Sequence, residues 1–158
     1  MPEQTPLDRA LKLLARRSRT AVELDRALEK AGVAQSDRES ALARLRELGY
    51  INDAETARMR ARTRVALGDA PRLATRRLQA KGVDAGVARE AAAEAAAGAG
   101  EEELISRALQ RRLRGRKPAD MREKQRLVRA LAAKGHRPSA VARALGIVWE
   151  GDDDIDDP

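Results

Sequence analysis

The sequence contains no cysteine and almost no aromatic residues. Its 158 residues include one tyrosine, one tryptophan and no phenylalanine. The lack of cysteine excludes disulfide bonds, thiolate nucleophiles and cysteine-ligated metals. With so few rings, a core has to be built from leucine, alanine and valine, and there is no aromatic platform on which nucleic-acid bases could stack.

Long apolar runs are also missing, and no convincing run of β-branched residues is present. The N-terminus does not resemble a signal sequence, and no window is long enough to span a membrane. We therefore expect a cytoplasmic protein with no membrane partner. Alanine, leucine, arginine, lysine and glutamate dominate instead, which are good helix formers, so the predicted fold class is all-α.

Acidic residues are outnumbered, and the imbalance is uneven. There are 32 Lys and Arg against 25 Asp and Glu, a net charge of +7. Residues 1–50 hold 10 basic and 8 acidic side chains, residues 51–98 hold 9 and 6, and residues 101–149 hold 13 and 5. Six further acids lie in residues 150–158. Without the acidic C-terminal residues, the protein carries a positive charge that increases along the chain, and such a protein is expected to attract polyanions, above all nucleic acid.

Three segments of the chain end in the same way. A leucine precedes a glycine by four residues at Leu28–Gly32, Leu78–Gly82 and Leu131–Gly135. A glycine just beyond a basic last turn is typical of the end of a helix. Another helical segment precedes and follows each of the three, which predicts nine helices in three groups.

The predicted organisation is three tandem three-helix repeats at residues 1–50, 51–98 and 99–149, followed by a disordered acidic tail at 150–158. The expected helices lie at about 6–16, 20–31, 36–48, 53–66, 71–81, 85–97, 101–114, 121–134 and 138–146. Four pairs match or approximate capping boxes at expected helix starts: Thr20 with Glu23, Ser36 with Glu39, Asn52 with Glu55 and Asp120 with Glu123.

Arginine occupies every second position from 58 to 64. Such alternation is typical of a half-buried strand, but a helical reading fits better. On a helix one narrow apolar stripe forms, made of Ala54, Ala57, Ala61 and Val65. The arginines would then flank this stripe in two rows, either as solvated surface or as a binding surface.

Several segments follow one another in a distinctive order. They are "LRELGYINDAETAR" (45–58), "GDAP" (68–71) and "LQAKGV" (78–83), within a stretch from residue 10 to 97. In order and spacing they resemble the RecX family, regulators of the bacterial recombinase RecA. Thr56 and the "GDAP" turn depart from the family pattern, the third repeat matches loosely, and the acidic tail is additional.

This resemblance implies an elongated, curved array of helix-turn-helix-like repeats. It implies a cytoplasmic protein that binds the RecA–DNA filament and mainly inhibits filament extension, ATP hydrolysis, strand exchange and coprotease activity, in recombination, DNA repair and the SOS response. It implies no catalytic residue, no cofactor and no metal.

We predict that arginines of the second and third repeats contact the filament or its DNA. The candidates are Arg58, Arg60, Arg62, Arg64, Arg72, Arg76, Arg77, Arg111, Arg112, Arg114, Arg126 and Arg129. Direct DNA binding is expected to be weak and independent of sequence. Because the apolar stripes are narrow, a monomer is expected.

Two other classes of function are less well supported. A sequence-reading helix-turn-helix protein needs side chains that reach base edges, but the third helix of the second repeat offers only Arg89 and two glutamates. An enzyme needs catalytic groups, and the only histidine, His136, follows Gly135, where a loop or capping role is expected. "GAGEEE" lacks the Lys-Ser/Thr of a phosphate loop, and the tail lacks the pattern of a calcium loop.

Three features near the repeat boundaries and the C-terminus carry separate expectations. Tyr50 is expected to fill the joint between the first two repeats, and Trp149 to pack over the end of the third. The tail is expected to be solvated. A sharper hypothesis is that it folds back on the third repeat and masks basic surface until a filament displaces it.

Overall fold

The computed structural model describes residues 4–151 and residue 153. This part of the chain forms nine helices and no strand, which confirms the all-α prediction. The helices are α1 (Pro6–Arg16), α2 (Ala21–Lys30), α3 (Gln35–Glu47), α4 (Asp53–Ala66), α5 (Pro71–Gln79), α6 (Ala85–Ala96), α7 (Glu101–Leu113), α8 (Met121–Ala132) and α9 (Pro138–Ala144).

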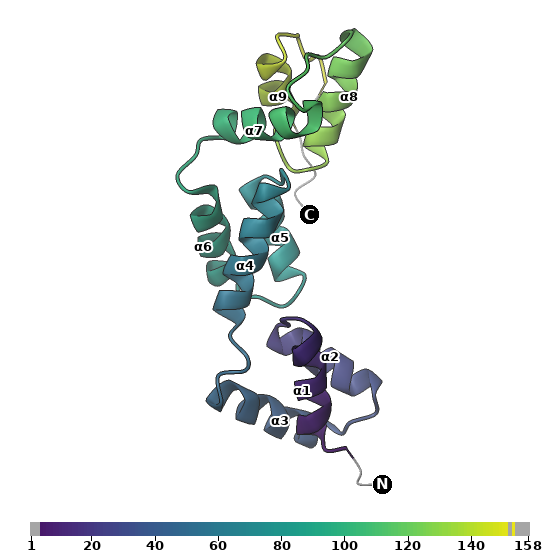
Figure 1. Cartoon of the computed structure of the whole chain (residues 1–158), viewed down its shortest axis with the longest axis vertical. Coiled ribbons are helices and arrows are strands. Elements are labelled where there is room, and N and C mark those ends of the chain that lie inside the picture. The colour runs from purple at the N-terminus through teal and green to yellow at the C-terminus, as the bar shows by residue number, and fades with distance from the viewer. Residues whose placement is uncertain (1–3, 152, 154–158) are drawn as a thin grey trace.

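The helices are arranged in three groups of three along one long axis (Figure 1). We call α1–α3, α4–α6 and α7–α9 the first, second and third repeat. The closest helix packing occurs inside each repeat, for example between α4 and α6 or between α8 and α9. The molecule is therefore elongated, because no repeat wraps around another.

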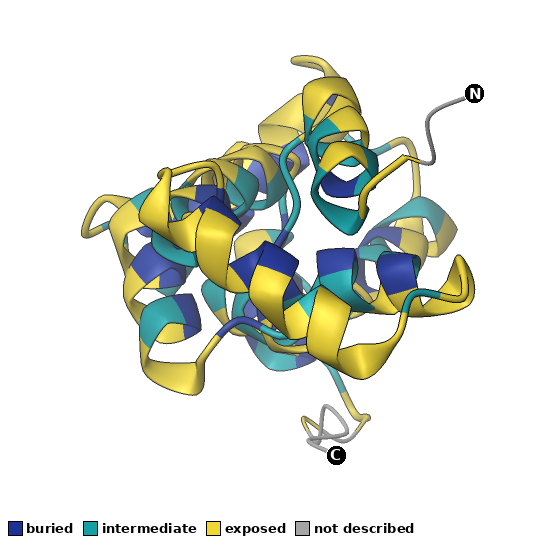
Figure 2. Cartoon of the chain, turned by 90° about the horizontal axis from the view of Figure 1, so that it is seen from below, coloured by how far each residue is buried: buried dark blue, intermediate teal, exposed yellow. Residues whose placement is uncertain are grey.

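Each repeat has its own small core. The buried positions lie on the inner sides of the helices, as the view along the long axis shows (Figure 2). In the first repeat Leu24, Leu28 and Leu45 are fully buried, and Ile51 joins them. Each such leucine contributes roughly 1.5–3 kcal/mol of hydrophobic stabilisation. The cores of the first and third repeats are built mainly from leucine with other aliphatic residues.

The core of the second repeat is built mostly from alanine. Ala57 and Ala61 on α4 pack with Ala88 and Ala91 on α6, and Leu78 comes from α5. Small side chains let α4 and α6 approach closely. The helical reading of the arginine-alternating segment is confirmed, with Ala57 and Ala61 at the centre of its buried stripe.

Three of the four predicted capping pairs are present. Thr20 and Glu23 form a complete capping box, while Asn52 and Asp120 each accept a hydrogen bond from the expected glutamate N–H. The Ser36–Glu39 prediction is wrong. Helix α3 begins one residue earlier, after Ala34, so Ser36 already lies in its first turn.

The predicted helix-ending glycines are confirmed, but their surroundings differ. Gly32, Gly82 and Gly135 have φ of 77°, 81° and 89°, in the left-handed region that favours glycine. A methyl group at Gly32 would meet nothing within 4 Å. At Gly82 it would lie 2.4 Å from Val22, and at Gly135 2.9 Å from Leu73. The second and third of these turns therefore receive a helix of the preceding repeat.

Tyr50 and Trp149 lie in different environments. The ring of Trp149 packs against the core of the third repeat, as predicted. Tyr50 is 57% exposed, so the prediction that it fills the first joint is wrong. The backbone N–H of Tyr50 donates to Leu45 O as part of the turn after α3, and the apolar position after that turn is taken by Ile51 instead.

Candidate functional site

The contact between the first and second repeats, which we call the first joint, is made by hydroxyl groups, by Glu23 with Arg60 and the more distant Lys81, and by a hydrogen bond from the Ala21 N–H to Asp53. Thr20 donates its hydroxyl to Lys81 O at 2.6 Å, and the hydroxyls of Ser18 and Thr56 lie 2.8 Å apart. Arg60 pairs with Glu23 at 2.7 Å. The Arg60 side chain therefore stabilises the contact between the first and second repeats.

Glu23 is well hidden in this joint, and its pKa reflects two opposing effects. Burial, the largest single effect, raises the pKa of a carboxyl group. The hydrogen bonds from Arg60 and from the Thr20 N–H, together with the positive charges of Arg60 and Arg17, lower it by more than burial raises it, so the pKa of Glu23 lies below its ordinary value.

The second joint, between the second and third repeats, is organised by a buried acid. Asp69 is 2% exposed, and its carboxylate accepts from Arg64 at 2.8 Å and from Lys134 at 3.1 Å. Arg77 lies 3.6 Å away. A buried carboxylate needs such partners, because an unpaired buried charge is strongly unfavourable. Lys134 belongs to the third repeat, so the acid ties two repeats together.

His136 completes the second joint. It follows Gly135 between α8 and α9, as expected, but its burial to 1% exposure was not expected. Its ring Nε2 lies 2.9 Å from Gly68 O, and because a carbonyl only accepts, Nε2 carries the proton. Nδ1 has no hydrogen-bond partner among the described residues.

The surroundings of His136 favour its neutral form. Burial, the largest effect, lowers the pKa of His136, and Arg72 acts in the same direction. The bond to Gly68 O and the nearby carboxylates of Glu101 and Asp69 oppose this without reversing it.

Basic side chains of the third repeat meet the C-terminal end of α4. Arg111 donates to Ala66 O at 3.0 Å and Lys134 to Leu67 O at 2.7 Å. These carbonyls lack partners inside the helix and lie at the negative end of its dipole, so they attract cations. The end of α4 therefore gathers positive charge at the second joint.

A cleft of about 220 Å³ opens at this place, and we call it the basic cleft. Four cations line it: Arg111, Arg112, Arg114 and Lys134. Its other lining residues are Leu67, Gly68, Ala108 and Leu131, so no carboxylate lines it. Arg112 and Arg114 are exposed, and their side chains make no hydrogen bond or ion pair with any described residue. Such a cleft is suited to an anion with several oxygen atoms.

The twelve predicted arginines thus fall into different settings. Arg111, Arg112 and Arg114 come together in the basic cleft, whereas Arg126 and Arg129 lie exposed on α8. Five others pair with carboxylates inside the molecule: Arg58 and Arg62 with Glu94, Arg60 with Glu23, and Arg64 and Arg77 with Asp69. Arg72 donates to Gly135 O, and Arg76 is half-buried on α5.

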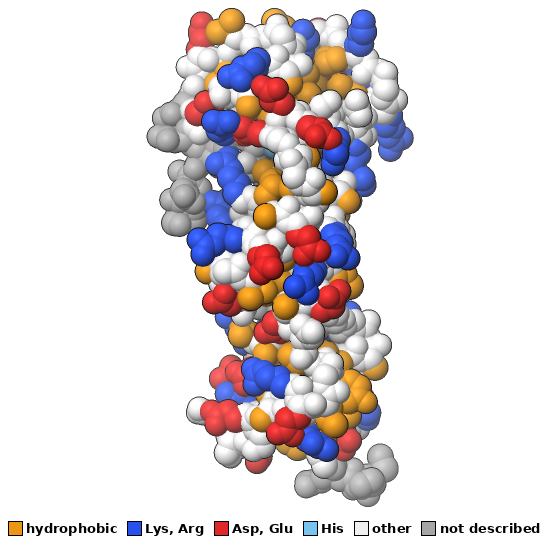
Figure 3. Space-filling view, turned by 90° about the vertical axis from the view of Figure 1, so that its left-hand side faces the viewer, with side chains coloured by type: hydrophobic (Ala, Val, Ile, Leu, Met, Phe, Trp, Pro, Cys, Tyr) orange, Lys and Arg blue, Asp and Glu red, His pale blue; other side chains and the backbone are white. Residues whose placement is uncertain are grey.

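Sequence reasoning missed the contacts that Lys134, Asp69 and His136 make at the second joint. Lys134 looked like an ordinary basic residue of a helix end, and Asp69 like part of a turn. The available signal was their position, since Lys134 precedes the shared helix-ending Gly135 and Asp69 follows Gly68. On the face seen in Figure 3, acidic and basic side chains are interspersed along the length of the molecule, which matches the internal pairing of many arginines.

The start of the predicted tail lies against the third repeat. Asp153 accepts from the Ser139 N–H at 2.8 Å, and hydrogen bonding to the Ser139 side chain, followed by this backbone bond, lowers the pKa of Asp153, with Arg137 and Arg143 adding to the effect. Residues 152 and 154–158, which hold most of the predicted disordered segment, lie outside the described residues.

The architecture defines the class of protein: an all-helical array of three-helix repeats. Within the described ranges, no group of three or more His, Asp or Glu side chains is placed to hold a metal ion. None of the described helices is long and apolar enough to cross a membrane.

Comparison of the sequence with known proteins identifies its family. The sequence profile of the first three-helix domain of RecX matches residues 7–45, and that of the third matches residues 100–145. The regulatory protein RecX of Stenotrophomonas maltophilia is 34% identical over 143 residues, which cover 90% of this chain and 86% of that protein. That of Chromohalobacter salexigens is 35% identical over 150 residues, covering 94% and 95%.

The chain belongs to the RecX family of regulatory proteins. The fold agrees. The crystal structure of RecX from Lactobacillus salivarius superposes with a TM-score of 0.66 at 19% identity, covering 89% of this chain and 92% of that one.

Proposed function

We propose that this protein regulates RecA, mainly as an inhibitor, by binding the RecA–DNA filament through its second and third repeats. It acts in the cytoplasm as a monomer and restrains filament extension, ATP hydrolysis, strand exchange and coprotease activity. It does so without catalytic residues, cofactors or metals. Membership of a family of regulatory proteins supports this proposal.

The basic cleft is the observation that carries the DNA part of the proposal. Four cations surround it and none of its lining residues is acidic. The side chains of Arg112 and Arg114 make no hydrogen bond or ion pair with described residues, so a phosphate gains their charge without breaking an internal pair. Contacts of this type depend on charge and not on base identity, and so predict weak, salt-sensitive binding.

The elongated shape explains how binding becomes inhibition. A protein whose repeats meet only at joints can lie along a polymer and contact more than one of its subunits (Figure 1). Bridging of neighbouring subunits opposes the relative movements that turnover and strand exchange require. Inhibition therefore follows from holding the filament, with no chemical step by this chain.

The test is a double charge reversal in the basic cleft. Arg112→Glu with Arg114→Glu should weaken binding to a single-stranded oligonucleotide at least tenfold. It should also make the salt dependence shallower by about 1.4 in log–log slope, because each lost phosphate contact removes about 0.7. Fluorescence polarisation at several salt concentrations measures both quantities. In parallel, inhibition of RecA ATP hydrolysis on single-stranded DNA should fall.

A matched control has the same change of charge elsewhere. Arg26→Glu with Arg89→Glu alters two exposed arginines on α2 and α6, away from the basic cleft. This control should retain most of the affinity and inhibition. Equal losses in both variants would show that the net positive charge of the protein, and not the basic cleft, determines binding. Undiminished inhibition by the cleft variant would refute a role of the basic cleft in inhibition.

A further inference from the structure

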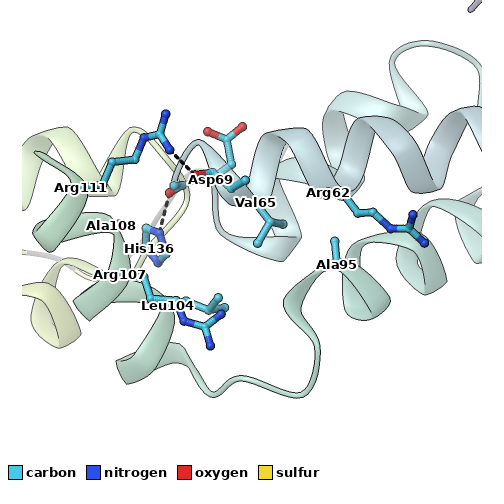
Figure 4. A pocket seen from close by; sticks show the side chains of 11 residues that line it. Arg62, Val65, Asp69, Ala95, Leu104, Arg107, Ala108, Arg111 and His136 are labelled. Carbon is cyan, nitrogen blue, oxygen red and sulfur yellow. Dashed lines mark hydrogen bonds between the residues drawn. The ribbon is translucent and has the colours of Figure 1, made fainter.

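A second cleft adjoins the basic cleft and has a different character. It has a volume of about 330 Å³ and shares Gly68, Ala108 and Arg111 with its neighbour. Val65 on α4, Ala95 on α6 and Leu104 on α7 form an apolar floor, and Arg62, Arg107 and Arg111 form the rim. Figure 4 shows Val65 and Leu104 beside the same space, with Arg107 next to Leu104. We call it the arginine-rimmed cleft.

The rim arginines can exchange their present partners for a ligand. Arg62 pairs with Glu94 at 3.0 Å, and Arg107 pairs with Glu103 one turn away on α7. The two arginine side chains are 61% and 58% exposed. Exposed ion pairs of this kind stabilise a protein by only about 0–1 kcal/mol, so a carboxylate of a ligand competes with them easily.

The acid that lines this cleft does not repel an anion. Asp69 is the only carboxylate among the lining residues, and it is buried. Its charge is matched by Arg64 at 2.8 Å and Lys134 at 3.1 Å. Of the three rim arginines, Arg62 and Arg107 are balanced by Glu94 and Glu103, so the unbalanced positive charge comes from Arg111, which pairs with no carboxylate among the described residues.

The apolar floor decides between nucleic acid and protein as the occupant. His136 supplies the only aromatic ring among the lining residues, and it is 1% exposed, so a base has no accessible ring to stack on. Valine, leucine and alanine instead suit an aliphatic or aromatic side chain, and arginines around such a pocket suit flanking carboxylates. A peptide segment in which one apolar side chain lies between acidic residues offers both the side chain for the floor and the carboxylates for the rim.

We propose that the arginine-rimmed cleft is a docking site for a segment of a RecA subunit that carries an apolar side chain flanked by Asp or Glu. This inference rests on the proposed function for the identity of the partner. The two clefts share Arg111, so one joint would contact protein on one side and DNA phosphate on the other. Contact with both components restricts the protein to RecA that is already assembled on DNA.

The first test separates the two clefts in the full chain. Val65→Glu with Arg107→Glu, and Arg107→Glu alone, should bind RecA–DNA filaments at least tenfold more weakly than the wild type, measured by co-sedimentation. Their binding to a free oligonucleotide should change less than threefold. Circular dichroism checks that both variants keep their helices, and Arg89→Glu is the control for charge.

The possible results distinguish this inference from the proposed function. If the wild type binds filaments and the cleft variants bind equally well, the docking site is refuted and the proposed function stands. If the wild type does not bind filaments, the proposed function fails, together with RecA as the partner.

The second test uses a defined probe and needs no RecA. A capped peptide of sequence Asp-Glu-Leu-Glu-Asp should shift the NMR methyl signals of Val65 and Leu104 in the full chain, and the same peptide with serine in place of leucine should not. Absence of a shift with the leucine peptide overturns the proposed ligand chemistry. A shift of the same signals by an oligonucleotide, or by Ile155→Ser in the chain's own tail, overturns the assignment to a partner protein.

Discussion

The two joints of the molecule have the same geometry and different chemistry. In each, the start of the second helix of one repeat meets the turn after the second helix of the next. Thr20 bonds to Lys81 O in the first joint, and the Ala70 N–H bonds to Lys134 O in the second. Thr20 and Ala70 are the N-caps of α2 and α5 and lie 50 residues apart.

The side chains around this shared frame differ greatly. The first joint uses hydroxyls and the Glu23–Arg60 pair. The second buries Asp69 and His136 and draws in cations from both repeats. The backbone fixes how repeats stack, while the side chains decide what a joint can bind. Both clefts described above lie at the second joint.

The largest expected effect on stability comes from adding a methyl group at the glycine where two repeats approach each other in each joint. Gly82→Ala should lower the free energy of unfolding by about 3 kcal/mol, because it combines a left-handed backbone costing roughly 1–2 kcal/mol with overpacking of 1–3 kcal/mol. The methyl group would lie 2.4 Å from Val22. Gly135→Ala should cost somewhat less, since its nearest neighbour, Leu73, lies at 2.9 Å. Chemical denaturation measures both.

Gly32→Ala provides the control, because the φ of Gly32 is similar to that of Gly82 and Gly135 and nothing lies within 4 Å of the added methyl group. It should show only the backbone cost, about 1–2 kcal/mol. Adding Val22→Ala to Gly82→Ala should recover part of the loss. Equal costs at all three glycines would show that the close approach of the preceding repeat does not matter for stability.

A smaller effect is expected from neutralising the acid of each joint. Asp69→Asn should destabilise the protein by about 2–3 kcal/mol, because hydrogen bonds to charged groups contribute roughly 1.5–3 kcal/mol each and Asp69 has two close partners. Glu23→Gln, which loses the single close pair with Arg60, should cost about 1–2 kcal/mol. Unfolding in urea compares the two, and a larger loss at Glu23 would contradict the ranking of the joints.

The smallest effect is a difference in pH dependence. Burial lowers the pKa of His136 from 6.5, so the unfolded chain takes up this proton more readily than the folded chain. The stabilisation is complete above about pH 6.5 and declines as the pH falls toward the folded pKa. The pKa of Glu23 is lowered from 4.5, so its contribution is complete above that pH and is lost only below it.

The second joint should therefore loosen first on mild acidification. Hydrogen exchange at pH 7.5 and pH 5.5 should show faster opening around Gly68 and His136 than around Thr20 and Lys81. His136→Gln should remove most of this difference. Equal loosening of both joints at pH 5.5 would contradict the assignment to His136.

Much of the fold could be predicted because its signals are local. Helix-ending glycines, capping residues and the alanine stripe of α4 depend on neighbours within a few positions, and each expected helix agrees with the structure within two residues at either end. The start of α3 was misplaced because Ser36 and Glu39 satisfy the capping pattern although Ala34 precedes the helix. The repeat boundaries at residues 50 and 98 stay predictions.

The candidate site could be predicted only in part, because it depends on contacts between distant residues. The charge pattern indicated Arg111, Arg112 and Arg114, which do come together. It did not indicate that Arg60 and Arg62 bind acids inside the molecule, since those acids lie 37 and 32 residues away. Whether an arginine faces a ligand or an internal partner depends on the stacking of the repeats.

The turn at Gly32 has a consequence for how the molecule can grow. It already has the left-handed backbone and the open space that the other two turns offer to an incoming helix. The start of a helix from a further module could approach this turn without meeting an obstacle at Gly32 and without any change in the loop. Addition of a module at this turn is thus sterically simple, and a four-module relative is the form in which to look for it.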